Sequence, residues 1–224
     1  MKLSASLVAL LVAVGTANAA NLIVNGGFET GDLTGWTATS TEGTGGFSAT
    51  SQTYTPVSGN ATVGPHSGSY YAVSDDFGPQ TAYLTQTFTT PSTFNTDLLS
   101  FSIFVNDVYG GAYGSAGPGG QVNLLTSAGT LIAVLYGPAD TFENPIGQPN
   151  PYVNETINIT SYLARSTTYQ LQIQDTETSG TINVGVDDIS LQSATPEPAT
   201  LLSTALLGGL ILWCARRKRL SGRS

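Results

Sequence analysis

Short alternation of apolar and polar residues, repeatedly interrupted by turn residues, constrains the fold of this chain more than any other feature. Residues 169–174 read Tyr-Gln-Leu-Gln-Ile-Gln, and residues 99–105 place an apolar side chain at every second position. A period of two is typical of a half-buried β-strand. About nine or ten such strands, separated by Gly, Pro, Asn and Ser, predict an all-β antiparallel sandwich whose strand order the sequence does not give. The other candidate strands are 22–24, 70–73, 83–89, 121–125, 131–136, 152–159 and 181–191.

The two ends of the chain are hydrophobic in a different way. At the N-terminus, Lys2 precedes an apolar run over 3–14, and Ala17-Asn18-Ala19 follows it. A charged start, an apolar stretch and a small-x-small site predict a signal peptide over 1–19 that is cleaved after Ala19. At the other end, residues 199–215 are apolar. As a helix they would cover about 25 Å, slightly less than the roughly 30 Å hydrocarbon core of a membrane.

A basic cluster follows this apolar run, and a proline motif precedes it. The cluster is Arg216-Arg217-Lys218-Arg219, which predicts a cytoplasmic tail over 216–224 by the positive-inside rule. The motif is Pro196-Glu197-Pro198, and Pro198 suits the first turn of the predicted transmembrane helix. These three parts in this order resemble the PEP-CTERM sorting signal of Gram-negative bacteria. The resemblance implies cleavage by a membrane-embedded exosortase and release to the cell surface or beyond. An uncleaved, single-pass membrane protein is the alternative.

The part between these ends is a single domain with a strongly acidic balance. We place the sandwich at 20–192 and the linker at 193–198. Residues 20–195 contain Arg165 and fourteen acids, so their formal charge is +1 − 14 = −13. Such a charge excludes nucleic acid as a partner and is compatible with neutral glycans, divalent cations or basic surfaces. Cys214 is the only cysteine and lies in the apolar run, so no disulfide can form within the domain.

Four short segments of the domain resemble the galactose-binding-like jelly-roll modules, which include carbohydrate-binding modules. They read NLIVNGGFETGDLTGW over 21–36, HSGSYY over 66–71, LTQTF over 84–88 and VGVDDISL over 184–191. The resemblance implies a jelly-roll sandwich without catalytic activity and with a role in glycan binding. The association of PEP-CTERM tails with exopolysaccharide implies that the protein acts in the extracellular matrix.

The same resemblance implies a structural calcium ion where the first and last strands meet. The ligands would be Glu29 and one of Asp187 or Asp188, with backbone carbonyls near Gly27 completing the shell. Carboxylates and carbonyls are the oxygen ligands that Ca²⁺ prefers. The alternative interpretation is a pair of solvated carboxylates in a turn.

The phase of the last strand changes at the two aspartates. Val184 and Val186 have even numbers, whereas Ile189 and Leu191 have odd numbers. One inward face can contain all four only if the strand carries an extra residue between them. We therefore predict a β-bulge at Asp187-Asp188.

Aromatic residues near predicted loops are the candidates for stacking against sugar rings. Tyr109 and Tyr113 lie in a Gly-rich stretch over 109–120 that predicts a loop, and Tyr136 ends a predicted strand. Trp36 follows Gly35 at a predicted strand start, where we expect its indole in the core rather than on a binding surface.

Enzymatic activity has little support in the sequence. His66 is the only histidine, and residues 20–195 contain no lysine. A Ser-His-Asp triad is possible by composition alone, but no nucleophile motif accompanies it. A glycosidase needs only two carboxylates, and nothing distinguishes one pair among fourteen. We predict a non-catalytic protein, with a small polysaccharide hydrolase as the alternative.

Overall fold

The computed structural model describes residues 19–42, 45–75, 79–107, 119–137, 149–177 and 181–194. They belong to one compact unit, Ala19–Ala194. Residues 1–18 of the predicted signal peptide, the Pro-Glu-Pro motif, the apolar run over 199–215 and the basic tail lie outside the described residues. Within the described ranges, no helix has the length and apolar character needed to cross a membrane.

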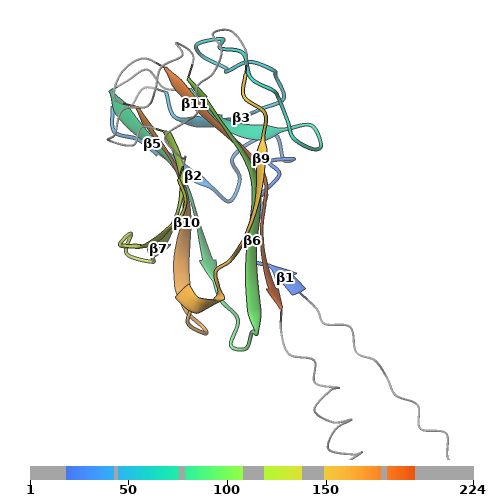
Figure 1. Ribbon diagram of the computed structural model, residues 1–224, viewed down its shortest axis with the longest axis vertical. Helices are drawn as coiled ribbons and strands as arrows, with labels where there is room; N and C mark the ends of the chain where they lie inside the picture. Colours follow the sequence, from blue (N-terminus) through green and yellow to red (C-terminus); the bar gives the residue numbers. More distant parts are fainter. Residues whose placement is uncertain are drawn as a thin grey trace, which may run out of the picture. The chain divides into compact units, whose positions relative to one another are not determined.

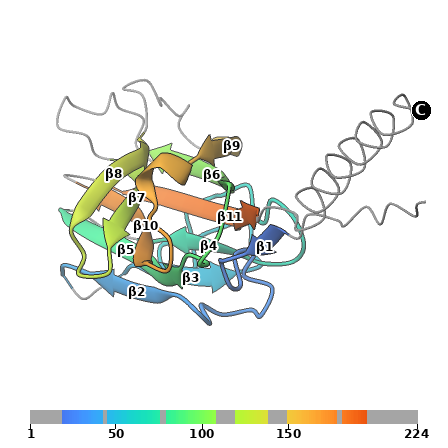
Figure 2. The ribbon, with the colours of Figure 1, turned by 90° about the horizontal axis from the view of Figure 1, so that it is seen from below.

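The domain consists of two antiparallel sheets packed face to face, as predicted (Figure 1). Sheet A has the order β3-β4-β11-β6-β9, with β1 paired to β11, and sheet B has the order β2-β5-β10-β7-β8 (Figure 2). The strands of sheet A are β1 (Ala19–Asn21), β3 (Phe47–Thr50), β4 (Tyr71–Ser74), β6 (Thr96–Asp107), β9 (Val153–Asn158) and β11 (Ile182–Ala194). The strands of sheet B are β2 (Thr37–Ser40), β5 (Gln80–Thr89), β7 (Gly119–Thr126), β8 (Leu131–Tyr136) and β10 (Thr168–Glu177). One 3₁₀ turn, Thr160–Tyr162, follows β9.

The expected strands match the observed ones where the alternation is longest and differ at the ends of the domain. The first strand is 19–21 rather than the expected 22–24, because the backbone of this segment pairs with the end of β11. β11 itself continues through Ser193 and Ala194, which we had placed in the linker. The sequence analysis did not predict β2 and β3, since each has only four residues and β2 carries no large apolar side chain.

The core lies between the two sheets and follows the predicted alternation. Leu99 and Ile103 of β6 are buried, as are Leu171 and Ile173 of β10. Burying one such side chain contributes about 1.5–3 kcal/mol. Trp36 belongs to the same cluster and is 7% exposed, so the prediction of a core indole is confirmed.

β11 contains the predicted bulge. Its register against β6 shifts between Asp187 and Ser190, and Asp188 adopts a left-handed conformation with φ of 52°. Val184 and Val186, before the bulge, and the two apolar residues after it, 189 and 191, all belong to the buried core cluster. The phase change in the sequence is therefore a bulge that keeps one apolar face inward.

β7 begins earlier than expected, within the Gly-rich stretch. Gly119 and Gly120, which we had assigned to a loop, are the first two residues of that strand. A side chain at Gly120 would lie 2.9 Å from a methyl group of Val105 and 3.1 Å from those of Val184. Glycine is therefore required here by close packing against the core rather than by loop flexibility.

A second, smaller apolar cluster lies on the opposite face of sheet A. It consists of Tyr71, Val73 and Phe104, with Tyr152 packed against them. The segment 51–70, which connects β3 to β4, bonds to the edges of this cluster. The Tyr152 hydroxyl donates to the carbonyl of Gly64 at 2.9 Å, and the Thr62 and Tyr71 hydroxyls are 2.6 Å apart. The outer face of sheet A is thus covered by a loop, not by solvent alone.

Candidate functional site

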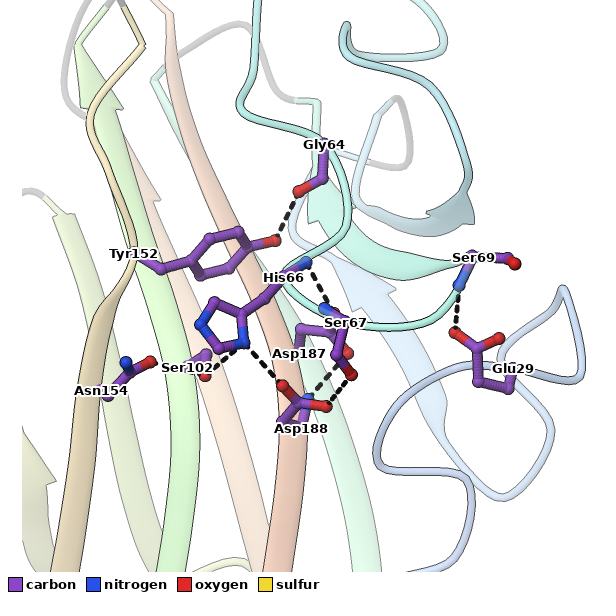
Figure 3. Close-up of polar contacts among 10 residues, drawn as sticks. All are labelled: Glu29, Gly64, His66, Ser67, Ser69, Ser102, Tyr152, Asn154, Asp187 and Asp188. Carbon is purple, nitrogen blue, oxygen red and sulfur yellow. Dashed lines mark hydrogen bonds and ion pairs between the residues drawn. The ribbon is translucent and has the colours of Figure 1, made fainter.

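Three segments distant in sequence meet on the outer side of sheet A, at the β11 bulge (Figure 3). They are residues 25–29, the loop 66–70 and Asp187-Asp188. The carboxylate of Asp187 accepts hydrogen bonds from the backbone N–H groups of His66 at 2.9 Å and Ser67 at 3.1 Å. We call the meeting of these three segments the junction.

Glu29 holds the other end of the same loop. Its Oε1 accepts hydrogen bonds from the backbone N–H groups of Ser69 at 2.8 Å and Tyr70 at 2.9 Å. Gly68 between them has φ of 61°, and a side chain there would overlap the Glu29 carboxylate. Glu29 and Asp187, which lie near opposite ends of the domain sequence, therefore accept hydrogen bonds from four backbone N–H groups of one loop. These N–H groups do not belong to a strand and need such partners.

Backbone strain concentrates at the junction. Four non-glycine residues in the described ranges have positive φ, and Asn25, Phe28 and Asp188 are three of them. Gly26 lies between the first two, and a side chain on it would overlap the carbonyl oxygen of Ile189. The Ile189 N–H donates to the Gly26 carbonyl at 2.9 Å. Strained backbone persists where surrounding contacts impose it, and such positions cluster at functional sites.

Asp187 is completely buried, which raises its pKa to about 6. Desolvation of the carboxylate is the largest cause, and the nearby charge of Asp188 acts in the same direction. The N–H donors of Ser67, Asp188 and His66 oppose this rise. Asp187 is therefore not the solvated turn carboxylate that our alternative interpretation described.

Asp188 organises the side chain of His66. The Nδ1 atom of His66 lies 2.7 Å from Asp188 Oδ2 and 3.2 Å from Ser102 Oγ. The Ser102 hydroxyl donates to the amide oxygen of Asn154 at 2.8 Å. A serine, a histidine and an aspartate thus meet, but serine and aspartate share one ring nitrogen. A catalytic triad places them on opposite nitrogens, so this cluster lacks triad geometry.

The acids predicted to bind calcium surround the same glycine without converging as three ligands. A Cβ atom on Gly27 would lie 3.7 Å from Asp187 Oδ1, 4.0 Å from Asp188 Oδ1 and 3.8 Å from Glu29 Cγ. Among the described residues, no three Asp, Glu, His or Cys side chains form a metal-ligand group. The two aspartate oxygens fit a hard cation in chemistry. Asp187 Oδ1 accepts the N–H of Asp188 at 2.7 Å and Asp188 Oδ1 accepts the Ser67 hydroxyl at 2.6 Å, while Glu29 directs Oε1 to the loop and has Oε2 available.

The predicted sugar-stacking tyrosines are not brought together in the described structure. Tyr109 and Tyr113 lie outside the described residues. Tyr136 is half-buried and packs edge-on against the core residue Phe101, with ring centroids 5.8 Å apart. Burial and the charge of Glu155 raise the Tyr136 pKa. Its ring is part of the edge of the core rather than an exposed platform.

The outer face of sheet B has a different character, which the sequence analysis did not single out. The five strands of this sheet contain two charged residues, Asp175 and Glu177, and both are buried. The side chains that alternate with the buried ones are amides on β10 and β7, hydroxyls and one phenol on β5, and apolar groups on β8. They are Gln170, Gln172, Gln174, Gln121, Asn123, Thr81, Tyr83, Thr85, Leu131 and Val134.

Two amides near the centre of this face have groups without a hydrogen-bond partner among the described residues, and of these Asn123 is buried while Gln172 is partly exposed. Asn123 donates to the Gln174 side chain at 3.1 Å, but its buried Oδ1 has no partner. Gln172 lies between Asn123 of β7 and Thr85 of β5, and its amide makes no hydrogen bond with the described residues. The Tyr-Gln-Leu-Gln-Ile-Gln alternation could have predicted this face, because its polar residues are all uncharged glutamines.

No protein-family model matches this sequence, and no curated protein matches it. A solved cleaved-adhesin domain of Lys-gingipain from Porphyromonas gingivalis superposes with a TM-score of 0.53 and 14% identity, covering 78% of this chain and 99% of that domain. The carbohydrate-binding module TmCBM61, solved with β-1,4-galactotriose, gives 0.47 and 17%, covering 77% and 97%. The tailspike protein 4 domain of bacteriophage CBA120 gives 0.46 and 13%, covering 77% of this chain and 21% of that one. The adhesin likeness establishes a shared β-sandwich fold.

Proposed function

We propose that this protein is an exported, non-catalytic β-sandwich that binds neutral glycans through the outer face of sheet B. The observation that carries the proposal is the absence of outward charged side chains on the strands of this sheet, in a domain with a formal charge of −13. Amides and hydroxyls donate and accept hydrogen bonds without a charge, and a neutral sugar offers matching hydroxyl groups.

The layout of the face also suits a sugar ring. Tyr83 on β5 is partly exposed and lies directly opposite Gln174 on β10. Gln174 itself is bonded to Asn123 and Thr176, but Gln172, two residues along the same strand, makes no hydrogen bond with the described residues. A phenol ring near that amide provides an apolar surface for the ring carbons and polar groups for its hydroxyls. Because the candidate contacts are few, we expect dissociation constants of micromolar or weaker, about −8 kcal/mol at 1 µM.

A glycan array and a turnover assay test this function together. The protein is expected to retain neutral oligosaccharides and to release no reducing ends from them. Released oligosaccharide that disappears when one acidic pair is mutated would support the small surface hydrolase instead. Retention of only charged polymers would contradict a site on the uncharged face.

The export route is a further part of the proposal. We propose that the signal peptide over 1–19 is removed and that an exosortase cuts at Pro196-Glu197-Pro198. The inner membrane would hold the chain before processing, and the cell surface or the exopolysaccharide matrix would hold it afterwards. The support is the order of the sequence motifs. Intact-mass measurement on protein from a native host tests it: a tail that is never removed would leave a single-pass membrane protein.

We also propose that Ca²⁺ occupies the junction as a structural ion, where it would neutralise the two adjacent aspartates. Asp187 and Asp188 would supply carboxylate oxygens beside Gly27, and Glu29 would join through Oε2. The support is the oxygen-only donor set and the close approach of both aspartates to Gly27.

A further inference from the structure

Two buried polar side chains at the end of the core have no partner in the structure. Asp97 on β6 and Ser193 on β11 are both 0% exposed. Within the described part of the chain, neither carboxylate oxygen of Asp97 accepts a hydrogen bond, and the Ser193 hydroxyl makes none. A buried polar group without a partner is costly, and an uncompensated buried charge costs more. A cation beside Asp97 would therefore be stabilising, and the side chains around it supply none.

The side chains of the domain offer no such partner. Residues 20–195 contain no lysine, and their single arginine, Arg165, is exposed. The only ion pair among the described residues joins His66 to Asp188. A cation for Asp97 must come from elsewhere, and the backbone of the chain has one possible source.

That source is the residue at which the mature chain is expected to begin. Ala20 on β1 is the direct partner of Ser193 on β11, and Ser193 is the direct partner of Asp97 on β6. β11 lies between the other two strands, and Figure 1 shows β1 beside its end. Side chains in register share one face, so the three positions form a row that runs from the exposed Ala20 to the buried Ser193 and Asp97.

We propose that the α-ammonium group of mature Ala20 is the cationic partner of Asp97 and is linked to it through the Ser193 hydroxyl. Neighbouring strands are about 4.8 Å apart, so Ala20 and Asp97 are separated by about 10 Å. That distance is too long for direct contact, and the Ser193 side chain stands between the two residues in the register. It can accept a hydrogen bond from the ammonium and donate one to the carboxylate.

Cleavage of the signal peptide creates the α-ammonium group of Ala20. Hydrolysis of the Ala19–Ala20 peptide bond adds one water, leaving a carboxylate on Ala19 and an amine on Ala20. The amine takes up a proton at neutral pH, since an α-amino group ordinarily titrates near 7.7–8.0. Before cleavage the same nitrogen is an uncharged amide. Removal of the signal peptide thus completes the core, and the mature domain is more stable than its precursor. This inference rests on the cleavage site in the proposed export route and not on glycan binding.

Two chains that differ only at the N-terminus test the inference. One begins at Ala20 and the other at Asn18, both end at Ser224, and both are released in vitro from a fusion partner and melted in the same detergent. At pH 6.5 the Ala20 chain is expected to melt about 5 °C higher, because the bridged charges stabilise only its folded state. The difference should shrink as pH rises above about 9, where the ammonium loses its proton.

Substitutions assign the effect to the row. Asp97→Asn is expected to bring the two melting temperatures together, and Ser193→Ala should remove most of the difference. Asp32→Asn, which changes an exposed carboxylate, should leave the difference intact. Equal melting temperatures for the two unmodified chains, or a difference that survives Asp97→Asn, would overturn the proposal.

A titration of the amine tests the inference if Asp97→Asn does not fold. With isotope-labelled Ala20, NMR should show the pKa of the amine raised above its ordinary range in the folded Ala20 chain. An amine that titrates in its ordinary range would contradict the ion pair. Because both chains are made in vitro, neither result depends on whether a cell cleaves after Ala19.

Discussion

The two outer faces of the sandwich have opposite compositions. The face of sheet A carries the junction, where Asp187 and Glu29 accept backbone hydrogen bonds from the loop 66–70 and Asp188 orients His66. The face of sheet B carries no outward charge on its strands and keeps a free amide at Gln172. The carboxylates of the junction are bonded within the domain, whereas the Gln172 amide on sheet B makes no hydrogen bond with the described residues. This difference underlies our proposal that sheet A stabilises the domain and sheet B recognises a ligand.

The largest expected effect tests the structural role of the junction. Gly26→Ala places a methyl group against the Ile189 carbonyl, which belongs to the backbone and cannot move aside. We expect a loss of at least about 3 kcal/mol in the free energy of unfolding, measured by urea denaturation. Gly27→Ala is the matched control, because its methyl group meets only ordinary contacts of 3.7–4.0 Å. Equal losses for both substitutions would show that the close approach at Gly26 is unimportant.

The next effect concerns ligand binding on sheet B. Gln172→Ala removes the central free amide and is expected to weaken glycan binding about tenfold, or about 1.4 kcal/mol, as measured by calorimetry. The melting temperature should change little, since Gln172 makes no hydrogen bond with the described residues. Ser190→Ala, on the outer side of sheet A, is the control and should leave affinity unchanged. Weaker glycan binding by Ser190→Ala, with unchanged binding by Gln172→Ala, would assign recognition to sheet A.

A smaller effect is expected in the pH dependence of stability, because Asp187 of the junction has a raised pKa. The folded pKa of Asp187 is about 6, above the ordinary value of about 3.9 in an unfolded chain. Its contribution to stability is therefore fully present below about pH 3.9 and is lost as pH rises through about 6. In chelator, the wild type should gain about 1 kcal/mol between pH 7.5 and pH 5 relative to Asp187→Asn. Parallel stability curves for the two proteins would indicate that Asp187 titrates normally.

Calcium is expected to give the smallest effect. With a dissociation constant of about 1 mM, typical of weak extracellular sites, 1 mM Ca²⁺ would add only about 0.4 kcal/mol. The melting temperature should rise by about 1–2 °C. Glu29→Gln tests the ligand role, since the amide keeps an acceptor for Ser69 and Tyr70. A response to Ca²⁺ that persists in this variant would place the ion elsewhere.

The parts of the fold that follow from side-chain periodicity could be predicted from the sequence. The alternation over 169–174 identified β10, and the phase change around Asp187-Asp188 identified the bulge. The short strands β2 and β3 could not be found this way, because four residues give too few repeats of the pattern.

The candidate sites were harder to predict, because their partners are distant in sequence. The family resemblance placed Glu29 near the paired aspartates. It did not predict that Glu29 and Asp187 accept hydrogen bonds from the N–H groups of the loop 66–70. Ser102 and Asn154 meet His66 only through the pairing of β6 with β9 and β11. The neutral face of sheet B likewise requires the order of its strands, which no single-strand pattern contains.

Chemical-shift mapping with ¹⁵N-labelled protein tests the central claim most directly. The neutral oligosaccharide that binds most tightly on the array is titrated into the folded domain, and the perturbed amides are assigned. We predict that the perturbations centre on Tyr83, Asn123 and Gln172 of sheet B, while Ser67 and Ser69 of the junction stay unchanged. Perturbations confined to the junction would contradict the assignment of recognition to the uncharged face.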